Sequence, residues 1–238
     1  QEVKDDLEGL RGILQFLPTR YKLVFSDPGG NKERSAFLYN SKKMSLLEKV
    51  GEVNVPPSDF SKIKIGQMDG FTGFDRNPYI ASFDAEGFKF VVVSVHNFFG
   101  SEAPADMKRR ILETYAIARW ADLRRESVNA YSPNIMVMGD FNLPKVEPGD
   151  DVFLALTARG LQLPDHSTHA FSNITNDKQY DQIAFFPSLK SKLLSHGVFS
   201  FDNVLFGNLW QESQAKFRSY LRYYVSDHRP MWAELSLT

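Results

Sequence analysis

Residues 226–235 read Ser-Asp-His-Arg-Pro-Met-Trp-Ala-Glu-Leu, with an acid and a histidine side by side at the entrance of an alternating strand. Burying a charged side chain costs several kcal/mol unless the charge is paired. Adjacent strand residues point in opposite directions, so we expect Asp227 and His228 to reach different partners of one site. A simple polar turn is the alternative. Three other segments favour the site: Gln1-Glu2-Val3, residues 138–142 (Met-Gly-Asp-Phe-Asn) and residues 180–183 (Tyr-Asp-Gln-Ile).

Length and composition indicate one folded domain, residues 1–238. Of the 238 residues, 42% are hydrophobic, which is enough for a sizeable core. The net charge of -1 gives no overall attraction to polyanions, so a nucleic-acid partner would be held by a local basic patch or through metal ions. The absence of cysteine excludes disulfides, thiolate nucleophiles and cysteine metal sites. No apolar run approaches the roughly 18 residues that span a membrane, and no compartment is indicated.

The spacing of apolar residues predicts strands that alternate with a few helices. We expect helices at residues 7–17, 104–129 and 152–158, and a partly helical segment at 201–224. Strands are expected at residues 21–25, 36–39, 45–50, 79–83, 88–95, 134–138, 182–186, 193–199 and 231–235, with 45–50 paired to 36–39. The weakly periodic segment 53–78 is interpreted as substrate-side, because long connections without regular structure are commonly functional. Polar motifs cluster at strand ends, which predicts two packed sheets with helices outside.

Several polar residues at strand ends are candidates for chemistry. Asp140 and Asn142 follow a buried strand at positions i and i+2, where their oxygens suit Mg2+ or an attacking water. A local Asx turn is the alternative. Asp181 precedes an apolar strand and could orient a catalytic histidine or bond the local backbone. His96 ends the most apolar strand, where a general acid or base and a hydrogen-bonded core histidine are equally good interpretations.

Other polar residues carry weaker signals. Glu2, Glu33 and Arg76 are single charges, and such charges lie more often on the surface than in a site. His166 and His169, at positions i and i+3 in a polar loop, only weakly suggest a metal pair. The sequence holds neither a Gly-rich nucleotide loop nor a Gly-x-Ser-x-Gly elbow.

The ordered set Gln-Glu-Val, Val-His, Gly-Asp-Phe-Asn, Tyr-Asp-Gln-Ile and Ser-Asp-His-Arg-Pro resembles the endonuclease/exonuclease/phosphatase superfamily, which has the deoxyribonuclease I-like fold. The resemblance covers nearly the whole chain, and Gly-Asp-Phe-Asn together with Ser-Asp-His is a specific combination. It implies an α/β (α+β) fold, a four-layer α-β-β-α sandwich of two packed mixed sheets flanked by helices. It also implies cleavage of a phosphoester with a divalent metal, Mg2+ or Mn2+.

The same resemblance implies roles for the residues at a metal. Glu2 resembles the metal-binding glutamate of the family, with Asp227 beside it. Asp140 resembles the residue that positions or activates the attacking water at the metal. Asn142 would contact phosphate or a second metal ion.

It also implies roles for two histidines. His228 resembles the general acid/base histidine, oriented by Asp181. His96 resembles the second histidine of the site, and Glu33 resembles its partner, as in deoxyribonuclease I. A phosphodiester transition state gathers negative charge, which a metal ion and a protonated histidine would stabilise.

Substrate contacts and two departures complete the resemblance. Arg76 resembles the arginine that contacts the scissile phosphate, and Tyr180 adjoins it. The family begins with a strand ending in Trp-Asn, and this sequence starts after that pair, so we expect either a lost N-terminal segment or a missing central strand. Asn31 stands where deoxyribonuclease I-like enzymes carry a phosphate-contacting tyrosine.

The expected substrate is nucleic acid, with DNA favoured because Glu33 with His96 points to a deoxyribonuclease-like endonuclease. An aromatic and basic stretch could stack bases and meet phosphates, or could form a covering amphipathic helix: Trp210, Lys216, Phe217, Arg218, Tyr220, Arg222 and Tyr223. Two other hypotheses stay open. One is a phosphatase or phosphodiesterase acting on a small molecule or lipid headgroup, and the other is an inactive binding scaffold.

Overall fold

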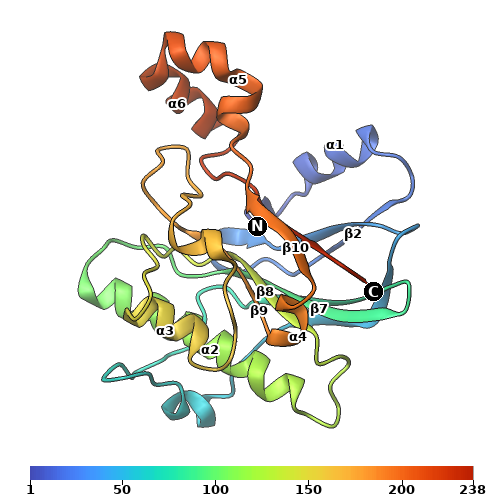
Figure 1. The fold of residues 1–238 in the computed structure, drawn as a ribbon, viewed down its shortest axis with the longest axis vertical. Coiled ribbons are helices and arrows are strands. Elements are labelled where there is room, and N and C mark those ends of the chain that lie inside the picture. The colour runs from blue at the N-terminus through green and yellow to red at the C-terminus, as the bar shows by residue number, and fades with distance from the viewer. Residues whose placement is uncertain (238) are drawn as a thin grey trace.

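The largest sheet of the computed structural model has five strands in the order β5-β6-β7-β8-β9 (Figure 1). The structure describes residues 1–237, apart from the side chains of residues 210, 214 and 215. The strands span Ser45–Glu52, Tyr79–Ala85, Phe88–His96, Ile135–Asp140 and Asp181–Phe185. Neighbouring strands are antiparallel except β7 and β8, which run parallel. Strands β6 and β7, both expected from the sequence, form an antiparallel hairpin.

The central strands of this sheet are covered on both faces. Val91 and Val93 of β7 belong to one apolar cluster with side chains of helices α2 (Pro104–Arg125) and α3 (Asp151–Thr157). Val92, which points the opposite way, belongs to a second cluster shared with the other layer of strands. Because each face of β7 meets a different apolar layer, its central residues 90–93 (Phe-Val-Val-Val) are apolar without alternation.

The second layer of strands consists of short antiparallel ladders. Strand β2 (Tyr21–Phe25) pairs with β4 (Ala36–Asn40), and β10 (Leu193–Val198) pairs with β11 (Met231–Leu235). Apolar side chains of both ladders pack against the five-stranded sheet. Within residues 1–237, no hydrogen-bonded strand joins the two ladders. A third ladder is formed by β1 (Val3–Lys4) and β3 (Glu33–Arg34). The expected packing of two strand layers with helices outside them is confirmed.

One strand pairing was predicted wrongly. We expected residues 45–50 to pair with residues 36–39, but β5 pairs with β6. Strand β4 pairs instead with β2, without a register shift, from Tyr21 opposite Asn40 to Phe25 opposite Ala36. After the turn that follows β4, the chain therefore crosses from the smaller layer to the larger sheet.

The segment 53–78 is a packing element more than a substrate loop. Its buried Ile63 and Phe71 lie in one apolar cluster with Leu112 of α2. The substrate-side interpretation therefore fails for most of the segment. It holds only near the C-terminal end of the segment, where Arg76 reaches the cleft described below.

The remaining helices lie outside these layers. They are α1 (Glu8–Phe16), α4 (Pro187–Lys190), α5 (Phe201–Glu212) and α6 (Gln214–Tyr224). Helices α5 and α6 form a hairpin that stands off the body (Figure 1) and has its own small apolar core. Helix α2 ends at Arg125, four residues before the predicted end at 129. Among the described residues, no helix is both long and apolar enough to cross a membrane.

Candidate active site

Strand register brings three predicted polar residues into one row. His96 at the end of β7 lies opposite Asp140 at the end of β8, and Asp140 lies opposite Asp181 at the start of β9. Because β7 and β8 are parallel and β9 is antiparallel to them, all three residues reach the same edge of the sheet. The pattern of polar residues at strand ends therefore has a direct topological cause.

The glycine of Gly-Asp-Phe-Asn is required by the close packing of β7 and β8. Gly139 has φ of 136°, and a Cβ atom there would lie 2.1 Å from the carbonyl oxygen of Val95. Beyond it, Asp140 Oδ1 accepts a 2.7 Å hydrogen bond from the backbone N–H of Asn142. The Asn142 side chain donates in turn to the carbonyl of Asn97 at 2.9 Å. The Asx turn and the candidate site thus coexist, since the turn fixes both polar side chains.

His228 is held by Asp181, as the resemblance implied. His228 Nδ1 lies 2.8 Å from Asp181 Oδ2, and the ring stacks on Tyr180 with 5.6 Å between centroids. Burial alone lowers the pKa of His228, but the hydrogen bond and charge of Asp181 outweigh it and raise the pKa to about 9. His228 is therefore protonated at neutral pH.

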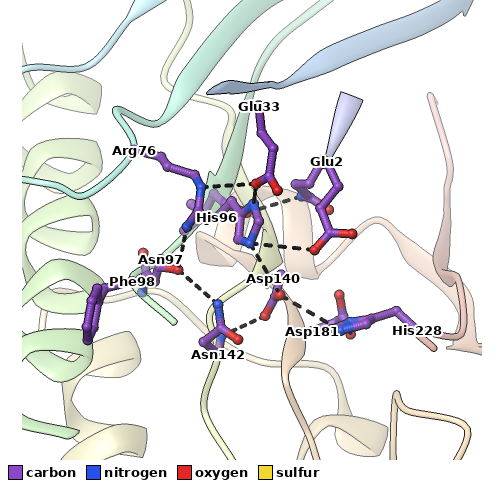
Figure 2. A network of polar contacts seen from close by, with 12 residues as sticks. Glu2, Glu33, Arg76, His96, Asn97, Phe98, Asp140, Asn142, Asp181 and His228 are labelled. Atoms are coloured by element: carbon purple, nitrogen blue, oxygen red, sulfur yellow. Dashed lines mark hydrogen bonds and ion pairs between the residues drawn. The ribbon is translucent and has the colours of Figure 1, made fainter. Parts of the chain in front are cut away.

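His96 is surrounded by three acids (Figure 2). Its Nε2 lies 3.7 Å from Asp140 Oδ2 and 4.0 Å from Glu2 Oε1, and its Nδ1 lies 3.6 Å from Glu33 Oε2. The expected pairing of His96 with Glu33 is thus present as a contact. Burial raises the pKa of Glu33 above its ordinary value.

Arg76 supplies the positive charge beside His96. Its Nε lies 3.2 Å from Glu33 Oε2, and its guanidinium also donates to the carbonyl of Asn97. Burial, and next the charge of Arg76, lowers the pKa of His96 to about 3. His96 is therefore neutral at the pH at which His228 is charged.

Asp140 lies between the two histidines. Its Oδ2 is 3.7 Å from His96 Nε2 and 4.0 Å from His228 Nε2. Burial, and next the charge of Asp181, raises the pKa of Asp140. A carboxylate with a raised pKa beside a protonated imidazole is the arrangement expected of an acid and a base that work at neutral pH.

The donor set fits a hard divalent cation. Ligand atoms of Asp140, Asp181 and His228 lie within 4.8 Å of one another. Asp181 and His228 already bond each other, so Asp140 with the nearby Glu2 is the better pair of oxygen donors. The negative charge of Asp181 and Glu2 disfavours ionised Asp140, and a bound cation would relieve this repulsion. Asp227 contacts Arg222, with Oδ2 3.3 Å from Nε, so Asp227 and His228 do reach different partners.

These residues border a cleft of about 450 Å³. Every predicted site residue except Asp181, which contacts the ring of His228, lines it: Glu2, Glu33, Arg76, His96, Asp140, Asn142, Tyr180, Asp227 and His228. Asn31, where the family carries a tyrosine, also lines the cleft. Residues from both halves of the sequence thus meet at one surface.

The sequence did not reveal two residues that position this site. Asn97 is buried, and its carbonyl accepts hydrogen bonds from both Asn142 and Arg76. Glu113 of α2 accepts from the backbone N–H groups of Asp75 and Phe98, so it clamps the two loops that carry Arg76 and Asn97. The position of Asn97 directly after His96 was the only signal. Glu113 reads as an ordinary helical glutamate.

Other candidates lie elsewhere. His166 Nδ1 lies 2.6 Å from His196 Nδ1, whereas His169 contacts the hydroxyl of Thr168. The contact of His166 is thus with His196, and neither His166 nor His169 lines the cleft. Arg218 and Arg222 of the aromatic stretch do line it, and the side chain of Trp210 lies outside the described residues.

Solved structures share this architecture. A mannosyl-6-phosphatase from Bacteroides thetaiotaomicron matches with a TM-score of 0.59 and 16% identity, over 97% of this chain and 82% of that one. An endonuclease/exonuclease/phosphatase from Bacteroides vulgatus matches with a TM-score of 0.58 and 17% identity, over 99% and 83%. The chain has the endonuclease/exonuclease/phosphatase fold. The 3′ phosphatase NExo from Neisseria, bound to a product DNA hairpin, also shares it, with a TM-score of 0.57 and 13% identity over 99% and 86%.

Sequence comparison adds no closer relative. No protein-family pattern matches the chain, and no curated protein matches it. The endonuclease/exonuclease/phosphatase fold is therefore established by structure, at sequence identities below 20% in these three comparisons.

Proposed function

We propose that this chain is a divalent-metal-dependent phosphodiesterase, an endonuclease that hydrolyses nucleic-acid phosphodiester bonds. The observation that carries the proposal is Asp140, a buried carboxylate between the neutral ring of His96 and the protonated ring of His228. Hydrolysis of a phosphodiester requires a base for water and a cation for the developing negative charge. This cleft supplies both.

Each side chain has a distinct part in that chemistry. The oxygen of water bonds to phosphorus while the bond from phosphorus to the ester oxygen breaks. Asp140, which faces both histidines, takes the proton of the attacking water. His228 donates its proton toward the leaving oxygen, and Asp181 keeps the ring charged and oriented. Arg76 and Asn142 stabilise the charge on the other phosphoryl oxygens.

The residues proposed to hold a divalent cation, Mg2+ or Mn2+, are Glu2, Asp140, Asn142 and Asp227. Carboxylate and amide oxygens are the ligands that these hard ions prefer. When bound, such an ion supplies Lewis-acid stabilisation of phosphoryl oxygens. The crowding of negative charge around Asp140 supports this assignment.

DNA is the favoured substrate. The cleft carries arginines from two separate elements, Arg76 before β6 and Arg222 on α6, as a backbone with repeated phosphates requires. The NExo structure, which has the same fold, is bound to a DNA hairpin. A second candidate is a phosphatase on a small phosphoester, because the similar structure from Bacteroides thetaiotaomicron is a mannosyl-6-phosphatase.

One experiment separates these functions. The protein is incubated with supercoiled plasmid, with bis(4-nitrophenyl) phosphate and with mannose 6-phosphate, in Mg2+, in Mn2+ and in EDTA. We expect metal-dependent nicking of plasmid and hydrolysis of the diester, both abolished by EDTA. Release of phosphate from mannose 6-phosphate without nicking would assign the second candidate. Inactivity on all three substrates would contradict a phosphoester hydrolase.

A further inference from the structure

The α5–α6 hairpin reaches the cleft without covering the body. It stands off the layers of strands (Figure 1), and its apolar core is built from its own helices together with Ile174. Through Arg218, Ser219 and Arg222 it forms one wall of the candidate active site. The amphipathic helix among the two expected interpretations is thus present, but its apolar residues pack on the other helix of the hairpin and on Ile174, not on the layers of strands.

The hairpin is fixed to the catalytic motif. Arg229, the residue after His228, donates two hydrogen bonds to Asp202 of α5, both 2.9 Å or shorter. Both side chains are buried, so the pair is a firm anchor. The wall that α6 presents to the cleft is consequently held in a set position relative to His228.

Helix α6 presents arginines to the cleft and exposes tyrosines that do not line it. Arg218 and Arg222, one helical turn apart, share the face that lines the cleft. Tyr223, one turn beyond Ser219, lies next along the helix surface and is 80% exposed. Tyr220 and Tyr224, 51% and 67% exposed, continue the aromatic surface with 4.7 Å between their ring centroids.

We propose that α6 is a binding arm for single-stranded nucleic acid, on which a strand leaving the scissile phosphate is held by Arg218 and Arg222 and stacks its bases on Tyr223 and Tyr220. Arginine and tyrosine in this order suit a backbone phosphate followed by an unpaired base. The proposal rests on the proposed function and assigns the substrate of the same cleft as a polymer. It also explains why these tyrosines are exposed.

A lipid surface is the competing occupant of the hairpin. Helix α5 exposes Val204, Leu205 and Leu209, and aliphatic side chains bind acyl chains better than they bind bases. The wall that continues the cleft, however, carries arginine and then tyrosine from α6. The substrate that enters the cleft meets this α6 surface, which favours nucleic acid.

Hydrolysis kinetics test the arm with two substrates. We expect Tyr223→Ser to raise KM for a 12-nucleotide single strand roughly ten-fold, the usual effect of losing one stacked base. Hydrolysis of bis(4-nitrophenyl) phosphate, which is too small to reach Tyr223, should stay unchanged. The matched control is Phe16→Ser, which removes an aromatic side chain that is 89% exposed on α1. It should change the hydrolysis of neither substrate.

Salt dependence tests the arginines. Arg218→Gln should weaken binding of the oligonucleotide and make its affinity less sensitive to salt, because one phosphate contact is lost. Arg218→Lys should retain most of the affinity, and Arg20→Gln, an exposed arginine before β2, should have no effect. Fluorescence anisotropy in EDTA measures this binding without hydrolysis, so it still reports on the arm if the proposed function fails.

Three outcomes would contradict the proposal that α6 is a binding arm. One is unchanged oligonucleotide affinity in both Tyr223→Ser and Arg218→Gln. Another is that Tyr223→Ser lowers hydrolysis of the oligonucleotide and of the small diester equally, which would show that the substitution acts through the structure and not through binding of the strand. The last is binding of the protein to vesicles of phosphatidylglycerol that Tyr223→Ser weakens while oligonucleotide affinity stays the same, which would assign the hairpin to a lipid surface.

Discussion

Arg229 and Asp202 are joined by two hydrogen bonds in the interior, from Nε to Oδ1 at 2.9 Å and from Nη2 to Oδ2 at 2.6 Å. The arginine side chain is 5% exposed and the aspartate 0%. Arg229 follows the candidate catalytic His228, and Asp202 lies in the first turn of α5. A single buried ion pair therefore connects the motif Ser-Asp-His-Arg-Pro to the hairpin beside the cleft.

Breaking this pair from one side should be costly. Arg229→Met leaves the Asp202 carboxylate buried without its cation, and we expect the free energy of unfolding to fall by about 3–5 kcal/mol. Urea denaturation measures the loss. The double variant Arg229→Met with Asp202→Leu removes both charges and should recover part of it. A double variant less stable than either single variant would contradict a paired-charge explanation.

Gly139 should not tolerate a side chain. Its φ of 136°, and the 2.1 Å between the Val95 carbonyl oxygen and the position that a Cβ atom would occupy, leave no room for alanine. We expect Gly139→Ala to lower stability by about 1–3 kcal/mol or more and to lower activity, because Asp140 would be displaced. Thermal unfolding and kcat measure the two effects. Gly51→Ala in β5, where nothing lies within 4 Å, is the control and should be neutral.

The charge on His228 should depend on Asp181. Asp181 holds the pKa of His228 at about 9, so wild-type activity should fall as pH rises through that value and the ring loses its proton. Asp181→Asn removes the carboxylate charge, and burial then lowers the pKa of the ring. We expect the alkaline limb of kcat/KM to move to lower pH, with activity at pH 8 reduced roughly ten-fold or more. An unchanged limb would show that His228 is not the titrating group.

His166 should make the protein sensitive to acid. Burial, and next the neighbouring His196, lowers the pKa of His166 to about 4, whereas an unfolded histidine titrates near 6.5. Between these values the unfolded chain binds a proton that the folded chain does not, so stability should fall as pH falls from about 6.5 to about 4. The decline of the urea midpoint over that range should be shallower in His166→Phe. His169→Phe is the control, and an equal decline in both variants would refute the assignment.

The sequence predicted most elements and most candidate residues of the site. Alternating or unbroken apolar runs located the strands, and polar residues at the ends of β7 and β8 located His96 and Asp140. Which strands pair is a long-range property, so the pairing of β5 with β6 was not predictable from the neighbouring residues 36–39. The projecting hairpin was missed for a related reason. An amphipathic helix reads the same whether its apolar face covers the body or a second helix.

Glu113 shows a different limit of prediction from the sequence. Its carboxylate is buried, its pKa is raised to about 7 chiefly by burial, and it accepts backbone hydrogen bonds from Asp75 and Phe98. In the sequence it is one of several charged residues of α2, and nothing distinguishes it from them. Residues that touch the reacting groups have recognisable types and positions, whereas residues that support them are revealed only by contacts.

The most direct test compares metal-dependent diester hydrolysis by wild type, His228→Ala and Asp140→Ala. Circular dichroism first shows that the variants keep the wild-type fold. We predict that kcat on bis(4-nitrophenyl) phosphate in Mg2+ or Mn2+ falls by a factor of about 100 or more in each variant, because each removes an acid or base group from the reacting centre. Wild-type activity retained in either folded variant would contradict the role assigned to that residue and to the site.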